Sequence, residues 1–229
     1  MALWNFIKKH SRWLLPLIAL LLIAPFTPYL DLKISGWFYR DGGFPADAYA
    51  KFFYYWGFYP AEIVAVVSLL LLIASIFFIS LKPFRRDLTL LVLTLAIGSG
   101  LIVHGILKDH WGRPRPVQIT EFGGQQQFRP FYDPDFSLTT HFKSFPCGHG
   151  SVGFYFFALM LIAQRRHLKS LEFIALGLAL FLGFSLSYAR IAMGGHFFSD
   201  ALVSALIMWW TALSLNWLLY RRSFNEGIN

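Results

Sequence analysis

The sequence predicts an all-α, polytopic membrane protein with six transmembrane helices and a short interfacial helical segment. Apolar residues make up 56% of the 229-residue chain and charged residues only 14%, unlike the composition of soluble domains. Apolar runs that approach or exceed the ~20 residues needed to cross a bilayer recur along the chain. Basic residues gather at the ends of these runs, as they do where they set membrane topology. We expect a single membrane-embedded domain covering residues 1–229.

Net charge and cysteine content limit the classes of partner and site. The formal net charge of +8 would suggest a nucleic-acid partner in a soluble protein. Here the cations lie at the ends of apolar runs, so no nucleic acid is expected. The single cysteine, Cys147, excludes an intramolecular disulfide and a metal site built from several cysteines.

The first span is expected at residues 13–30. The basic residues before it and its apolar start resemble the first two regions of a signal peptide. However, the apolar run continues to Leu30 without an Ala-x-Ala site at its end, so we expect a helix that is not cleaved. Residues 31–55 are rich in aromatic side chains, which predicts an interfacial belt or a short helix lying on the membrane.

Further apolar runs predict the remaining five spans, at residues 56–80, 87–107, 150–163, 171–189 and 197–219. The fourth of the six is short, and three phenylalanines mark its apolar body. Glu62 is an acid well inside the apolar run of the second span. An intramembrane carboxylate is a functional candidate, but its nearness to the interface leads us to expect Glu62 outside the site.

The distribution of lysine and arginine predicts the orientation of the chain. Dense basic clusters occupy alternate connections and both ends of the chain: Lys8, Lys9 and Arg12; Lys82, Arg85 and Arg86; Arg165, Arg166 and Lys169; Arg221 and Arg222. Basic residues on the other side are spread over longer connections. The positive-inside rule therefore predicts cytoplasmic termini and places residues 108–149 and 190–195 on the opposite side of the membrane.

A rigid basic segment opens the long connection after the third span, with the sequence Lys108-Asp-His-Trp-Gly-Arg-Pro-Arg115-Pro116. Proline fixes its own φ and restricts the residue before it, so Arg113 and Arg115 are expected to be extended. A fixed, forked cation suits the binding of an oxyanion. The alternative is a snorkelling patch that attracts lipid headgroups.

The same connection closes with Phe145-Pro146-Cys147-Gly148-His149-Gly150 before the fourth span. A turn of small residues that leads into a helix N-terminus exposes backbone N–H groups to an anion. His149 at that entry is positioned for proton transfer. Considered alone, it would more often be an interfacial histidine than a catalyst.

A third polar stretch, Arg190-Ile-Ala-Met-Gly-Gly-His196-Phe-Phe-Ser-Asp200, lies between the fifth and sixth spans. His196 and Asp200 are four residues apart, so a helix that has begun by His196 places both on one face. The carboxylate can then orient one ring nitrogen and leave the other as a base or nucleophile. Considered alone, this stretch is equally well explained as an interfacial arginine and histidine.

Together the three stretches resemble the signature of the type-2 phosphatidic acid phosphatase and vanadium haloperoxidase superfamily. That signature is Lys-x6-Arg-Pro, then Pro-Ser-Gly-His, then Ser-Arg-x5-His-x3-Asp, and its spacings and order are kept from Lys108 to Asp200. The resemblance implies a metal-independent membrane lipid phosphatase of the six-helix branch. Similarity to bacterial members of the superfamily implies a bacterial inner membrane, and the positive-inside rule places the active site on the periplasmic face.

The resemblance implies catalytic roles for three residues. His196 would attack phosphorus to form a phosphohistidine, and Asp200 would orient it. His149 would protonate the leaving alkoxide and then activate water.

Five further residues would bind the phosphate by the same resemblance: Lys108, Arg115, Arg190, Cys147 and Gly148. The three cations would neutralise the charge that a metal ion neutralises in other phosphoryl-transfer enzymes, so no metal or other cofactor is expected. Arg113, His110 and His141 are expected to be secondary.

Two positions depart from the family pattern. Cys147 and Ala189 stand where the family has serine. A thiol is a weaker donor than a hydroxyl, so we expect reduced phosphate affinity rather than lost activity. Cys147 is not expected to be the nucleophile, because cysteine phosphatases need Cys-x5-Arg and Gly153 occupies the arginine position.

The expected partners are a phosphorylated lipid and the bilayer, with no obligate protein partner. Candidate lipids are lipid A, undecaprenyl diphosphate, phosphatidylglycerophosphate and phosphatidic acid. The motif wording is similar to the bacterial lipid A phosphatases of this superfamily, particularly the 4′-phosphatase branch, so lipid A is expected. The alternatives are a phosphatase for the other lipids, a lipid-to-lipid phosphotransferase, and a non-catalytic lipid-binding or transport protein.

Overall fold

The computed structural model describes residues 2–137 and 142–226. Within these ranges the chain is helical and forms no strand, so the predicted all-α class is confirmed. The main helices, in chain order, are α1 (Ala2–Ile23), α2 (Thr27–Phe38), α3 (Ala48–Trp56), α4 (Tyr59–Ala74), α5 (Arg85–Leu93), the π-helix η3 (Thr94–Lys108), α6 (Gly148–Phe154), α7 (Phe157–Arg165), α8 (Lys169–Ala192) and α9 (Phe198–Glu226).

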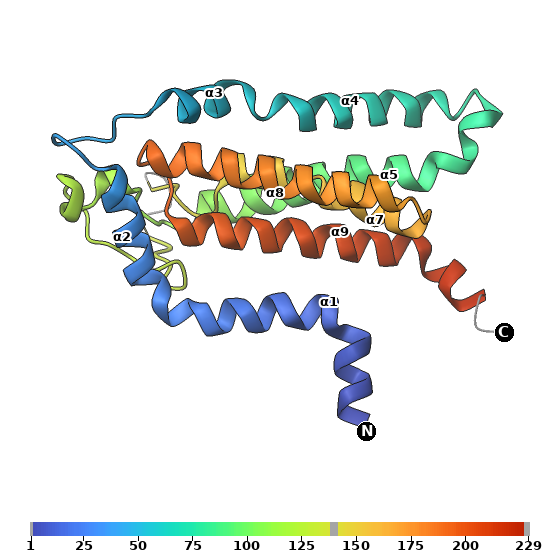
Figure 1. Cartoon of the computed structure of the whole chain (residues 1–229), viewed down its shortest axis with the longest axis horizontal. Helices are drawn as coiled ribbons and strands as arrows, with labels where there is room; N and C mark the ends of the chain where they lie inside the picture. The colour runs from blue at the N-terminus through green and yellow to red at the C-terminus, as the bar shows by residue number, and fades with distance from the viewer. Residues whose placement is uncertain (1, 138–141, 227–229) are drawn as a thin grey trace.

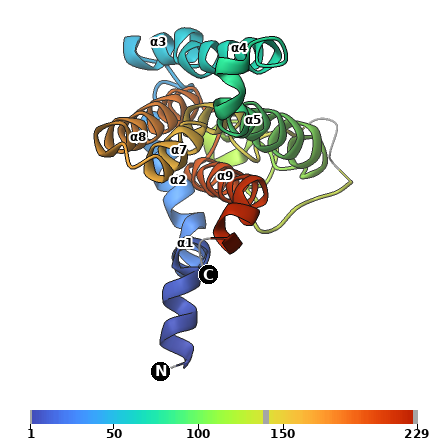
Figure 2. The same ribbon diagram turned by 90° about the vertical axis from the view of Figure 1, so that its right-hand side faces the viewer.

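The helices form a layered bundle along the long axis of the molecule (Figure 1). α3 and α4 run in line along one side, and α1 lies on the other (Figures 1 and 2). α5, α7, α8 and α9 occupy the space between them, and α6 packs closely against α8, α9 and η3. This layering puts α6 and α7 in the interior of the bundle.

Five helical segments are long and apolar enough to cross a membrane, judged by length and composition: His10–Phe38, Ala48–Ala74, Ile79–Lys108, Lys169–Ala192 and Phe198–Arg221. The six predicted spans are therefore not all confirmed. The segment expected at 150–163 is divided into α6 and α7, with Tyr155 and Phe156 between them. Its apolar side chains are largely buried against the protein, so burial in the bundle explains the hydrophobicity that suggested a regular span.

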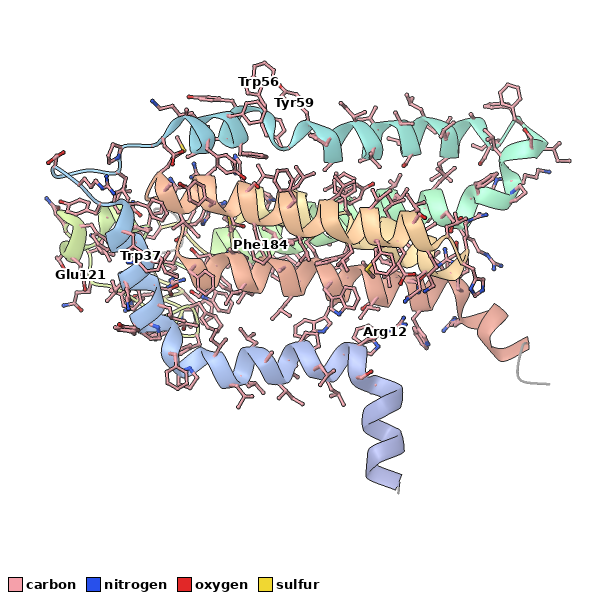
Figure 3. The ribbon with its side chains drawn as sticks, in the orientation of Figure 1. Arg12, Trp37, Trp56, Tyr59, Glu121 and Phe184 are labelled. Carbon is pink, nitrogen blue, oxygen red and sulfur yellow. The ribbon has the colours of Figure 1, made fainter. Side chains whose placement is uncertain are left out.

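The aromatic segment 31–55 forms the end of α2, a turn and the start of α3, which continues in line with α4 (Figure 1). Trp56 and Tyr59 point away from the bundle near the α3–α4 junction (Figure 3). Their rings lie 5.7 Å apart and are 60% and 43% exposed. Aromatic rings on the outer face suit the interfacial region of a bilayer.

Small residues let α6 and α8 approach each other closely. A Cβ added at Gly153 would collide with the backbone of Leu182 and Gly183, and one added at Gly183 would collide with the ring of Phe154. Glycine at both positions therefore sets the distance between the helix that begins near His149 and the helix that carries Arg190.

A buried carboxylate joins three helices at the end of the bundle where α5 begins and α7 ends. Asp87, on α5, accepts hydrogen bonds from Arg165, from Nε of Arg166 at 2.6 Å and from the hydroxyl of Tyr220 at 2.6 Å. The guanidinium of Arg165 also lies 3.4 Å from the ring centroid of Tyr220. This network accounts for part of one basic cluster that the sequence suggests as a topology signal.

Candidate active site

The three predicted motifs meet at the opposite end of the bundle from Asp87 (Figure 1). Lys108 ends η3, Cys147 precedes α6, and Arg190 lies in the last turn of α8. Asp200 lies in the first turn of α9, and its backbone carbonyl accepts a hydrogen bond from the Cys147 N–H at 3.3 Å. Three segments that are distant in sequence, around residue 108, around residue 147 and at residues 190–200, therefore converge on one site.

His196 and Asp200 form a buried pair. They are 1% and 0% exposed, and His196 Nδ1 lies 3.4 Å from Oδ2 of Asp200. That distance is longer than an ordinary N–H···O hydrogen bond, and Nδ1 has no hydrogen-bond partner among the described residues. Catalytic hydrogen bonds of this kind commonly tighten when substrate binds. The arrangement leaves Asp200 as the acceptor nearest to Nδ1.

Burial keeps the His196 ring neutral. It lowers the pKa of His196 to about 3, and the facing Asp200 opposes this effect only in part. The neighbouring charges of Lys108 and Arg190 lower the pKa further. A neutral imidazole has a free lone pair on one ring nitrogen, which is the form needed for nucleophilic attack.

The carboxylate of Asp200 is held in place by several donors. Its Oδ2 accepts from the hydroxyl of Ser144 at 2.6 Å and from the backbone N–H of Phe197 at 2.9 Å, while Oδ1 accepts from Nη1 of Arg113 at 2.5 Å. These bonds place the carboxylate beside His196. The sequence alone did not indicate the role of Ser144.

Arg113 is fully buried and connects three segments of the chain. Besides Asp200, it donates to Oδ2 of Asp31 at 2.8 Å and to the backbone carbonyl of Arg129 at 2.9 Å. Asp31, on α2, also accepts from the hydroxyl of Ser199 at 2.6 Å. One arginine thus pairs with two buried carboxylates, a structural role that its sequence motif did not indicate.

Lys108, Arg115 and Arg190 carry positive charge to the same region. Burial, followed by the charge of Arg190, lowers the pKa of Arg115, so these two cations lie close enough to repel each other. In the described part of the chain none of the three forms an ion pair with a carboxylate, and Nε of Arg190 is buried without a hydrogen-bond partner. Cations gathered in this way suit the binding of a phosphate group.

Cys147 and Gly148 pack directly against these groups. Cys147 is fully buried, and burial raises the pKa of its thiol. A neutral thiol is a poor nucleophile, which agrees with the sequence argument against a cysteine mechanism. A Cβ added at Gly148 would collide with the ring of His104 and lie 3.3 Å from Nζ of Lys108. Glycine at 148 therefore allows the start of α6 to approach η3.

His149 is held by aromatic rings from the second transmembrane segment. Its ring stacks on Tyr54 with a centroid distance of 5.2 Å and an interplanar angle of 9°, and the ring of Phe58 is nearly perpendicular to it at a centroid distance of 6.5 Å. The guanidinium of Arg190 lies 5.1 Å from the centroid of the same Tyr54 ring. Tyr54 therefore supports two predicted site residues, although its sequence context indicated only an interfacial aromatic.

We expect Tyr54→Leu to slow phosphate release about 10-fold, because stacking and cation–π contacts of this kind each contribute about 1 kcal/mol. Tyr54→Phe keeps the ring and should stay near the wild-type rate. The measurement is kcat/KM for phosphate release by each purified variant. Equal rates for the leucine and phenylalanine variants would contradict a positioning role for the ring.

A cavity of about 300 Å³ lies beside His149 and is lined by Phe58, Glu62, His104, Gly148, His149 and Val152. A second, mainly apolar groove of about 390 Å³ adjoins it and shares two of its lining residues, Glu62 and Val152. The groove continues between α4 and the segment 92–100. The structure thus brings Glu62, which we expected outside the site, to the junction between the predicted catalytic histidine and an apolar path.

The secondary histidine that the structure describes, His110, is not part of this arrangement. His110 is exposed, and its Nδ1 lies 2.6 Å from the carbonyl of Ile106. His141 lies outside the described residues. Among the residues that the structure describes, no group of three or more His, Cys, Asp or Glu side chains is placed to hold a metal ion.

Comparison with known proteins supports the motif assignment. Residues 88–224 match the PAP2 superfamily. A lipid A 4′-phosphatase of Francisella tularensis subsp. novicida is 32% identical over 205 residues, which cover 85% of this chain and 88% of that protein. A lipid A 4′-phosphatase of Rhizobium leguminosarum is 30% identical over 53% of this chain and 52% of its own length.

A lipid A 1-phosphatase of Rhizobium etli is 33% identical over 56% of this chain and 49% of its own length. The similar proteins therefore include enzymes named for different phosphates of lipid A. No solved structure gives a significant match.

Proposed function

The chain belongs to the PAP2 superfamily and is a membrane phosphatase of the type-2 phosphatidic acid phosphatase kind, and we propose that it removes a phosphate group from lipid A. The observation that carries this proposal is the position of His149 between a cluster of three cations and the mouth of an apolar groove. Such a site suits a substrate with a phosphate headgroup and hydrocarbon chains. The names of the similar proteins favour lipid A among such lipids.

In the proposed first step, the ring nitrogen of His196 that does not face Asp200 attacks phosphorus. A nitrogen–phosphorus bond forms as the bond from phosphorus to the leaving oxygen breaks. Burial and the charges of Arg190 and Lys108 lower the pKa of His149 to about 4, and a bound phosphate dianion offsets those charges. The His149 imidazolium then donates its proton to that oxygen, which leaves as the lipid alcohol. Lys108, Arg115 and Arg190 stabilise the charge on the non-bridging oxygens, where it is spread in the transition state.

In the proposed second step, His149 removes a proton from a water molecule, whose oxygen attacks the phosphohistidine. The nitrogen–phosphorus bond breaks, inorganic phosphate leaves, and His196 returns to its neutral form. One histidine thus serves first as an acid and then as a base. A lipid hydroxyl in place of water would instead make the protein a phosphotransferase.

We place this chemistry on the periplasmic face of a bacterial inner membrane. Support comes from the dense basic clusters around Lys82 and Arg165, which lie at the end of the bundle opposite the site (Figure 1). Basic residues concentrate on the cytoplasmic side of membrane proteins, so the site end is assigned to the other side. Both termini would then be cytoplasmic.

A phosphate-release panel with the purified full-length protein tests the proposal. We expect the highest kcat/KM with lipid A, compared with undecaprenyl diphosphate and phosphatidylglycerophosphate, and less than a twofold change on adding EDTA. A higher value for another lipid would replace lipid A as the substrate. Strong inhibition by EDTA would contradict a metal-independent site, and transfer of labelled phosphate to a second lipid would indicate a phosphotransferase.

A further inference from the structure

We propose that Glu62 and His104 form a subsite for the leaving alcohol, which recognises hydroxyl or amide N–H groups next to the phosphorylated oxygen. The proposal rests on the proposed phosphatase function and adds a selectivity to it. Both residues line the cavity that contains His149, with Glu62 coming from α4 and His104 from η3. Neither belongs to the three motifs that predict the catalytic residues.

The two side chains offer hydrogen-bond acceptors to this cavity. Nδ1 of His104 lies 2.7 Å from the backbone carbonyl of Ser99, and a carbonyl can only accept. Nδ1 therefore carries the hydrogen, and Nε2 of the neutral ring is an acceptor. Nε2 is the ring atom nearest to the position of a Cβ added at Gly148, so it faces the start of α6. A carboxylate such as Glu62 is also an acceptor.

Glu62 has no hydrogen bond or ion pair through its carboxylate in the described part of the chain. It lies on the exposed side of α4, among apolar residues that line the groove. Leaving a carboxylate unpaired in a membrane helix is costly, which makes it a candidate for binding a polar group of a ligand. The headgroup region of a lipid that enters through the groove would supply such a group.

The placement of charge also orients the substrate. Lys108 and Arg190 act on His149 from the phosphate-binding side, whereas Glu62 lines the cavity from α4. A phosphate group is attracted to the cations and repelled by the carboxylate, so the alcohol portion is directed toward Glu62 and His104. This orientation brings the leaving oxygen next to His149, which the proposed mechanism requires.

The subsite distinguishes lipids by the donors that flank their phosphate. An acylated amino sugar carries hydroxyl and amide N–H groups near the phosphorylated oxygen, and ceramide 1-phosphate carries both as well. The diacylglycerol portion of phosphatidic acid has ester oxygens there and no donor. A site built with acceptors favours lipids that carry hydroxyl or amide N–H groups next to the phosphate. When phosphatidic acid binds, Glu62 and His104 find no donor and stay unpaired.

The test compares ceramide 1-phosphate with phosphatidic acid, which are both two-chain phosphomonoesters. Glu62→Leu and His104→Phe should each reduce kcat/KM for ceramide 1-phosphate about 10-fold or more, because each removes an acceptor for a hydroxyl or amide N–H group of the bound lipid. Values for phosphatidic acid should change less than threefold. If the protein does not hydrolyse one of the two lipids, that lipid is added as a competitive inhibitor and its inhibition constant is measured for each variant instead.

Glu62→Gln and Glu121→Gln serve as controls. Glutamine keeps one acceptor oxygen at position 62, so its effect should be smaller than that of leucine. Glu121 lies among the loops (Figure 3) and does not line either cavity, so its replacement should not affect either lipid. Equal losses with the two lipids, or no loss with either, would overturn the subsite. Lipid A turnover by the wild-type protein reports separately on the proposed function.

Discussion

Replacing His196 with alanine is expected to abolish phosphate release while the folded protein remains in the membrane. Removal of a covalent nucleophile typically lowers kcat by a factor on the order of 10⁴ or more. His196 is the candidate because its ring is buried, neutral and placed beside Asp200. The effect is measured as the single-turnover rate of phosphate release from lipid A by the purified variant.

A second readout identifies the residue that attacks phosphorus. Wild-type protein mixed with ³²P-labelled lipid and quenched should carry an acid-labile, alkali-stable label, and His196→Ala should carry none. His110→Ala is the matched control, since His110 is exposed and lies outside the arrangement of site residues. Phosphate release near the wild-type rate in His196→Ala would rule out this residue as the nucleophile.

Replacing Arg113 with leucine is expected to lower the free energy of unfolding by about 3–5 kcal/mol, as is typical when one partner of a buried ion pair is removed. The leucine variant would leave the carboxylates of Asp31 and Asp200 buried without their shared cation. Activity should fall as well, because Asp200 would lose one of the donors that hold it beside His196.

The free energy is measured by denaturant titration in detergent micelles, followed by tryptophan fluorescence. Arg129→Leu provides the comparison, because the side chain of Arg129 pairs with Asp133 and Asp135 at a partly exposed surface. Such pairs contribute about 1 kcal/mol or less. Arg113→Lys keeps the charge without the forked geometry and should lie between the two. Similar unfolding free energies for Arg113→Leu and Arg129→Leu would disprove the structural role of Arg113.

Much of the candidate site could be predicted before the structure because its residues occur in three short motifs. The spacing within each motif is a local property, and each motif adjoins an apolar run. The eight predicted residues are indeed brought to one end of the bundle. Their individual roles remain predictions that the variants above address.

The supporting residues could not be predicted in this way. Asp31 and Arg113 are 82 residues apart, and nothing local to either indicates that they pair. Tyr54 resembles its exposed aromatic neighbours in sequence, and only its stacking on His149 separates it from them. Pro114, directly after Arg113, indicates a rigid backbone at this position, but it does not specify what the arginine side chain contacts.

Local patterns in the chain determined the helical class, most of the apolar spans and the residues expected to carry the chemistry. These patterns depend on hydrophobicity and spacing over short distances, which are properties of the sequence itself. Only the packed structure decided that residues 148–165 form two buried helices, that Arg113 pairs with two carboxylates, and that Glu62 and His149 line the same cavity. Burial and electrostatic pairing depend on segments far apart in sequence, so they are defined only once the helices have packed together.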